Sequence, residues 1–251
     1  MIYSRSNFLS EKDLREFPVL DDDGFLMKYF KQVCADTKMK EQTLSLPYFL
    51  ELQTPPKLDP TKYGALIVLD TYYCFNSAWT LEIIRNNMMS KPEYASMLDS
   101  VNALLEKYRK FVSSFVTDWH LSDDVSKSEL LDETVYAKIL NSVVVPTDNV
   151  KTYVQYERNA AEKEEPIYGL ITLFTCYAFW PILFRTFGTD IPESNLYREW
   201  IIGNQGGHSA IAVDGIVQTY WLDAGHSLDK DKVQNIIEDC LMCEYKMFKE
   251  G

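Results

Sequence analysis

The chain has 251 residues and a mass of 29.1 kDa, a length that a single larger core can accommodate. Its 37 acidic and 25 basic residues give a formal charge of -12, which argues against a protein that binds the phosphates of nucleic acid. Hydrophobic residues make up 46% of the chain and aromatic residues 14%, which excludes a disordered or fibrous chain. We therefore expect one domain over residues 1–251.

Hydrophobic residues recur at spacings of three and four along most of the chain, and no pair of alternating runs is joined by a hairpin turn. This pattern predicts an all-α fold, a single bundle of long antiparallel helices. The expected helices cover residues 24–33, 42–52, 60–89, 92–116, 148–161, 166–184, 194–204, 207–222 and 229–248, with a shorter amphipathic stretch around 130–140.

Residues 167–184 form a run of eighteen residues without a charge. This length is the lower limit for a helix that spans a membrane. The run contains threonines and a proline, and its flanking charges give no orientation signal. A buried central helix explains it better. Because the first ten residues lack the hydrophobic stretch of a secretory signal, we expect a cytoplasmic protein without a membrane partner.

The last helix carries an acidic residue on its hydrophobic side. Val233, Ile237 and Leu241 belong to one apolar stripe, and Glu244 falls within it. A carboxylate in a core is unfavourable unless it is paired, hydrogen-bonded or protonated, so Glu244 is a candidate functional residue. An ion pair with a buried Arg or Lys, or a place at the wet edge of the stripe, is the structural alternative.

Asp70 is likewise the only charge in the apolar run of residues 65–75. Tyr73 and Cys74 follow it at helical spacing, so a carboxylate, a phenol and a thiol share one face. A hydrogen bond from Asp70 to a Tyr or Trp of a neighbouring helix is the alternative. Cys176 lies in the middle of the apolar helix, where a cysteine is usually a small hydrophobic residue, but two buried carboxylates would make it a candidate nucleophile.

Metal and nucleotide sites find no support in the sequence. The five cysteines lack the paired spacing of a structural zinc site, so we expect free thiols. His120, His208 and His226 do not form a metal-binding motif, and no phosphate-binding glycine motif occurs. We expect no cofactor and no metal.

Four segments together resemble motifs of the TenA/thiaminase II family. Residues 69–73 are similar to its Gln-Asp-x-x-Tyr segment, residues 175–180 to its Pro-Cys segment, residues 197–201 to its Tyr-x-x-Trp-Ile segment, and residues 243–248 to its final Glu-x-x-Phe-Trp segment. Tyr153 precedes Cys176 by about the interval at which the family places a pocket tyrosine. The resemblance covers roughly residues 45–250, with an N-terminal extension at 1–20 and an apparent insertion at 117–140.

This resemblance implies the haem-oxygenase-like all-α fold without haem, and a hydrolase of thiamin salvage that cleaves thiamin or an aminomethyl aminopyrimidine. Cys176 would be the nucleophile, Glu244 the acid and base, and Asp70 the residue that holds the pyrimidine nitrogens. Tyr73 and Tyr153 would line the pocket. It also implies a homo-oligomer, a dimer or tetramer, by analogy alone.

Several positions depart from the family pattern: Leu69 replaces a glutamine, Thr175 a proline, Trp180 and Asn204 pocket tyrosines, and Met247 and Phe248 a Phe-Trp pair. The pocket is therefore remodelled, with Trp180, Asn204 and Met247 among its substrate-binding candidates. The alternative is a divergent or non-catalytic relative that binds another small heteroaromatic ligand.

Overall fold

The computed structural model of the chain describes residues 24–53, 58, 60–118, 145–188, 190–195, 197–222 and 227–250. Within these ranges every regular element is a helix, so the all-α prediction is confirmed. The expected extension at 1–20 and the stretch at 130–140 lie outside them, as does the expected insertion apart from its first two residues, which end a helix.

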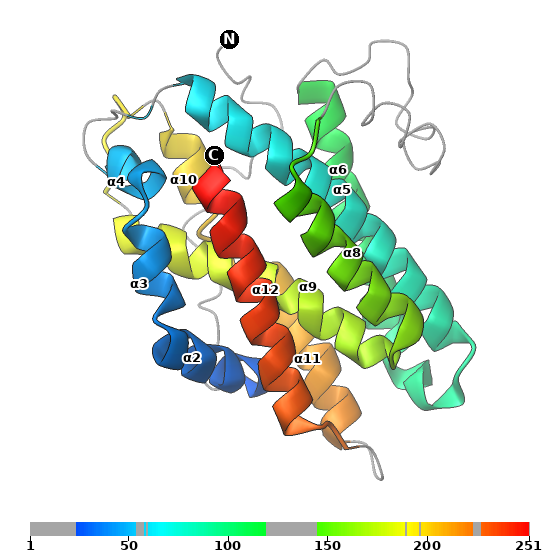
Figure 1. Cartoon of the computed structure of the whole chain (residues 1–251). Coiled ribbons are helices and arrows are strands. Elements are labelled where there is room, and N and C mark those ends of the chain that lie inside the picture. The colour runs from blue at the N-terminus through cyan, green and yellow to red at the C-terminus, as the bar shows by residue number, and fades with distance from the viewer. Residues whose placement is uncertain are drawn as a thin grey trace.

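The helices are labelled as in Figure 1: α2 (Phe25–Thr37), α3 (Met39–Leu44), α4 (Pro47–Gln53), α5 (Pro60–Met89), η1 (Pro92–Met97), α6 (Leu98–Asp118), α8 (Asp148–Lys163), α9 (Pro166–Phe184), η3 (Arg185–Phe187), α10 (Arg198–Gly203), α11 (His208–Leu222) and α12 (Lys230–Glu250). Most of the expected long helices are present to within a few residues. Two shorter ones differ from the prediction. The helix expected at 42–52 is divided at Ser45 into α3 and α4, and Pro47 begins α4 because a proline fits a first helical position. The helix expected at 194–204 is confined to Arg198–Gly203.

Helices α8 and α9 begin at the threonine and the proline that the sequence analysis predicts as their start signals. Pro166 is the first residue of α9. Thr147 is the N-cap of α8, and its side-chain oxygen accepts a hydrogen bond from the amide of Val150 at 3.4 Å. The two helices that flank the short loop at 164–165 thus have independent start signals.

The apolar helix α9 forms the centre of the molecule. It packs against α5, α8, α11, α12 and α2. The segment Pro166–Phe187 is apolar and long enough to cross a membrane, but 94% of its most apolar window is buried inside the protein. Burial on all sides, as expected, explains an apolar run that a surface helix would not carry.

Close packing holds α9 against its neighbours at Gly169. A Cβ at this position would lie 2.9 Å from Cγ1 of Ile84 on α5 and 3.1 Å from the Cα of Ala161 on α8. The missing side chain therefore allows α5, α8 and α9 to approach closely at one point.

Helix α5 packs against both α6 and α8, and α12 lies between α8 and the pair α2 and α3 (Figure 1). As a result, α5, α8, α9 and α12 all meet along the inner side of α8. We call the buried polar residues of this junction the polar seam: Asp70, Tyr73, Cys74, Ser77, Tyr153, Glu157, Cys176, Trp180 and Glu244.

Candidate active site

Glu244 is completely buried on α12, as its place in the apolar stripe predicts. The phenol of Tyr153 on α8 donates a hydrogen bond to its Oε1 at 3.0 Å. The indole Nε1 of Trp180 on α9 donates to its Oε2 at 3.1 Å. Both donors are neutral, so the carboxyl group is held by hydrogen bonds rather than by the ion pair considered as an alternative.

The environment of Glu244 changes its acidity. Burial raises its pKa to about 7, and hydrogen bonds from Cys176, Tyr153 and Trp180 oppose the rise. A carboxyl group with a pKa near neutrality is present in both protonation states at neutral pH. It can therefore both accept and donate a proton during a reaction.

Asp70 lies on the inner face of α5, with 9% of its surface exposed. The thiol of Cys74, one turn later, donates a hydrogen bond to its Oδ1 at 3.5 Å, so the predicted shared face is present. Burial raises the pKa of Asp70 to about 7, and the hydrogen bond from Cys74 opposes the rise. The partner that the structure gives Asp70 is thus on its own helix, not a Tyr or Trp of another.

Cys176 is a buried free thiol in the middle of α9. Burial raises its pKa well above the usual value, and repulsion by Glu244, Cys74 and Asp70 adds to the rise, whereas a hydrogen bond from Tyr73 opposes it. The resting side chain is therefore a protonated thiol beside two carboxyl groups. The three predicted catalytic residues come from α9, α12 and α5, and the structure brings them together.

The structure adds a third buried carboxyl group, Glu157 on α8, which our sequence interpretation missed. Tyr73 donates to its Oε1 at 2.7 Å, and Ser77 donates to its Oε2 at 3.2 Å. Burial raises the pKa of Glu157 to about 8, a rise that the bond from Tyr73 opposes and repulsion by Glu244 increases. The sequence does contain a signal for its burial, because Glu157 lies in the same apolar stripe as Val150, Tyr153 and Val154.

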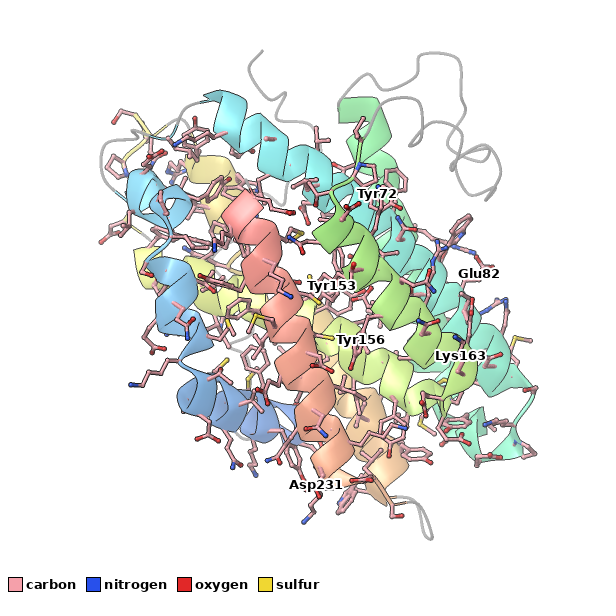
Figure 2. All side chains as sticks on the ribbon, viewed as in Figure 1. Tyr72, Glu82, Tyr153, Tyr156, Lys163 and Asp231 are labelled. Atoms are coloured by element: carbon pink, nitrogen blue, oxygen red, sulfur yellow. The ribbon has the colours of Figure 1, made fainter. Side chains whose placement is uncertain are left out.

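Two stacked tyrosines separate the two glutamates. The rings of Tyr73 and Tyr153 have centroids 4.8 Å apart and an interplanar angle of 25°. Their hydroxyl oxygens lie 3.4 Å apart. Tyr153 lies where α8 faces α12, as does Tyr156, which donates to Asp239 near the surface at 3.1 Å (Figure 2).

The three remaining substrate-binding candidates have different surroundings. Trp180 is buried, stacks on Phe184 at 5.6 Å, and directs its indole N–H to Glu244. Met247 is buried on α12, one turn after Glu244. Asn204, at the end of α10, is partly buried and donates through its amide to the backbone oxygen of Trp200 at 2.9 Å.

Thiols and histidines do not form a metal site in the described part of the chain. All five cysteines are free, as predicted. Among the described residues, no group of three or more His, Cys, Asp or Glu side chains could hold a metal ion. His208 is an exposed residue at the start of α11, whereas His120 and His226 lie outside the described ranges.

Solved structures with the same arrangement of helices are TenA homologues. That from P. horikoshii superimposes with a TM-score of 0.63 at 18% identity, covering 88% of this chain and 96% of its own. The homologue from Pyrococcus furiosus gives 0.57 at 14% identity, covering 88% and 98%. The homologue from Pseudomonas syringae pv. tomato gives 0.63 at 9% identity, covering 100% and 98%. The chain has the TenA fold.

The likeness to TenA structures confirms the resemblance seen in the sequence at the level of the fold. No protein-family model matches the chain, and no curated protein sequence matches it significantly. Sequence divergence of this degree is compatible with one TenA fold because a core tolerates extensive substitution if volume and patterning are kept. Function must then be argued from the polar seam itself.

Proposed function

We propose that the chain is a hydrolase of the TenA/thiaminase II type that replaces the amino group of an aminomethyl aminopyrimidine, or the thiazole of thiamin, with a hydroxyl group. The observation that supports this most directly is the meeting of Cys176, Glu244 and Asp70 at one buried junction of three helices. A thiol, a carboxyl group of near-neutral pKa and a second carboxyl group are the groups that such a reaction requires.

The first step is activation of the thiol. Because Cys176 is protonated at rest, its proton must leave as Sγ attacks, and an ionised Glu244 or Asp70 accepts it. A bond forms between Sγ and a carbon of the pyrimidine ring. A protonated carboxyl group that donates to a ring nitrogen makes the electron-poor ring easier to attack, and Asp70 is suited to this role because its pKa is about 7.

The second step is loss of the amine. The bond between the exocyclic methylene carbon and the amine nitrogen breaks, and the leaving amine takes its proton from Glu244. Water then adds to the methylene carbon and gives one proton to the ionised Glu244. The bond between Sγ and the ring breaks, and Glu244 passes this proton to Sγ to restore the thiol. The sum is aminomethyl compound plus water to hydroxymethyl compound plus amine, so no oxidant or cofactor enters the balance.

Aromatic side chains would bind the flat ring and exclude water from it. Tyr73 and Tyr153 are fully buried, and Trp180 is buried with its ring near Phe248 at 5.0 Å. Such walls favour a planar aromatic substrate and strengthen the electrostatic effect of the carboxyl groups.

Trp180 also favours a change in substrate preference. Its indole is larger than the tyrosine that the family pattern has at this position, and its N–H occupies one oxygen of Glu244. A differently substituted heteroaromatic amine is therefore the second candidate substrate class.

The test is product analysis by mass spectrometry with thiamin and with aminomethyl aminopyrimidine. We expect the wild type to release hydroxymethyl pyrimidine, and Cys176→Ala and Glu244→Gln each to lower kcat by a factor on the order of 10² to 10⁴. Cys34→Ala is the matched control, because Cys34 is a partly buried thiol on α2 outside the polar seam.

A folded wild-type protein that releases no product from either compound would contradict the proposal. Retained affinity for a pyrimidine in Cys176→Ala, without turnover in the wild type, would instead identify a binding protein.

A further inference from the structure

Glu157 has no part in the reaction proposed above, although it is as deeply buried as Glu244. A continuous line of oxygen atoms connects the two carboxyl groups. Glu157 Oε1 lies 2.7 Å from the Tyr73 hydroxyl, which lies 3.4 Å from the Tyr153 hydroxyl, which lies 3.0 Å from Glu244 Oε1. The line crosses from α8 to α5, back to α8, and then to α12.

The number of protons on this line decides whether its contacts are satisfied. Three oxygen–oxygen contacts need three protons, and the two phenols supply two. With both carboxyl groups ionised, one contact has no proton and two oxygen lone pairs face each other. With exactly one carboxyl group protonated, every contact holds one proton, and this is true whether the third proton starts on Glu157 or on Glu244.

We propose that Glu157 is a proton reservoir for Glu244, and that Tyr73 and Tyr153 pass one shared proton between the two carboxyl groups. In this arrangement Glu157 is a positioning residue that acts through Glu244. The inference rests on the function proposed for Glu244 as the acid of the reaction, but the shared proton can be detected without any turnover.

The transfer is balanced in atoms and charge. Glu157 Oε1 gives its proton to Tyr73, Tyr73 gives its own to Tyr153, and Tyr153 gives its own to Glu244 Oε1. Three O–H bonds break and three form, so the net change is one proton moved from Glu157 to Glu244. The contact between the tyrosines is longer than the usual 2.5–3.0 Å of an O–H···O bond, which makes it the limiting link.

Other titratable and charged groups face the two carboxyl groups, and their influence must be separated from that of the relay. They come from all four helices: Asp70 and Cys74 on α5, Arg158 on α8, Cys176 and Tyr177 on α9, and Cys240 and Cys243 on α12. The variants below leave all of these in place.

The direct test follows the side-chain carboxyl carbons by NMR in protein labelled with carbon-13 glutamate, with signals assigned from Glu157→Gln and Glu244→Gln. In the wild type we expect the two signals to titrate together, both moving in the same two pH steps, because a shared proton belongs to the pair. In Glu157→Gln, Glu244 should titrate in one step at lower pH. A Glu244 curve unchanged by Glu157→Gln would overturn the proposal.

The kinetic test compares the pH dependence of kcat. The wild-type pair keeps a proton up to about pH 8, whereas Glu244 alone keeps one up to about pH 7. We therefore expect Glu157→Gln to move the alkaline limb from near pH 8 to near pH 7, a loss of roughly fivefold at pH 8. Tyr73→Phe should move the limb in the same way, and the double variant should move it no further.

Tyr94→Phe is the matched control, since Tyr94 is a fully buried tyrosine that stacks on Tyr220 and donates to Glu165, away from the polar seam. Tyr94→Phe should leave the alkaline limb of the pH dependence of kcat unchanged. Coupled carboxyl titration without turnover would support the relay and contradict the hydrolase proposal. Turnover whose alkaline limb is unaffected by Glu157→Gln would support the hydrolase and overturn the relay.

Discussion

The apolar helix α9 and the polar seam that it borders satisfy their polar groups in opposite ways. The threonines of α9 bond within the helix: Thr172 donates to the backbone oxygen of Gly169 at 2.8 Å, and Thr175 to that of Ile171 at 3.5 Å. The two glutamates of the seam are bonded across helices, Glu157 by Tyr73 and Glu244 by Tyr153. A polar group satisfied locally needs no partner helix, whereas one satisfied across helices requires the whole bundle.

This difference separates stability from chemistry. The apolar side chains of α9 stabilise the fold by leaving water. The buried carboxyl groups work against folding once they are ionised, because burial disfavours their charged form. The seam therefore carries groups that a protein selected for stability alone would replace.

Removing a large side chain from α9 should produce the largest effect on stability. Phe174 is fully buried and packs edge-on against Phe30, with centroids 6.1 Å apart. We expect Phe174→Ala to lower the free energy of unfolding by about 3–5 kcal/mol through lost burial and a cavity. Denaturant unfolding would measure it. Phe111→Ala is the control: Phe111 is 45% exposed, so its removal should lower the free energy of unfolding by less than about 1 kcal/mol. Equal losses of stability in the two variants would contradict the view that the buried side chains of α9 stabilise the fold.

A change in the polar seam, at Glu157, should have an intermediate effect on the free energy of unfolding, and this effect should depend on pH. The pKa of Glu157 rises from 4.5 in the unfolded chain to about 8 in the folded one, so the folded state binds more protons between these values. Its contribution to the free energy of unfolding is therefore complete below pH 4.5 and is lost as pH rises to about 8.

Glu157→Gln removes this loss while keeping an oxygen to accept from Tyr73. We expect the variant to match the wild type near pH 4.5 and to exceed it at pH 8 by on the order of a few kcal/mol. Denaturant unfolding across this pH range would measure the gap. A gap of constant size at every pH would show that Glu157 does not change its protonation on folding.

The smallest effect should come from a surface ion pair beside the first turn of α9, which involves no residue of the polar seam. Lys232 on α12 lies 2.6 Å from Glu164 and 4.0 Å from the ring centre of Tyr168, but both charged side chains are partly exposed. Lys232→Ala should cost about 0.5–1 kcal/mol. Thermal unfolding at low and high salt would test this, because the ionic part of the difference should shrink as salt screens it.

Much of the seam could be predicted because a charge within an apolar stripe is conspicuous. Glu244 and Asp70 were found in this way, and both are buried. Glu157 shows the same signal, but the helix around it is rich in charged and polar residues, so its stripe is harder to see. Asn204 illustrates the opposite case, because its motif position suggests a pocket contact while its amide bonds to Trp200 in its own helix.

The sequence by itself determined the helices, because hydrophobic spacing, Pro60 and Pro166 at helix starts and the cap at Thr147 act over a few residues. It also determined the buried side of α12 and the burial of α9 on all sides. Only the tertiary structure decided the partners of Glu157 and Glu244. Tyr153 and Glu244 are 91 residues apart, and Tyr73 and Glu157 are 84 apart, so no local pattern can specify that their oxygens meet. Packing of α5, α8 and α12 around α9 brings them together.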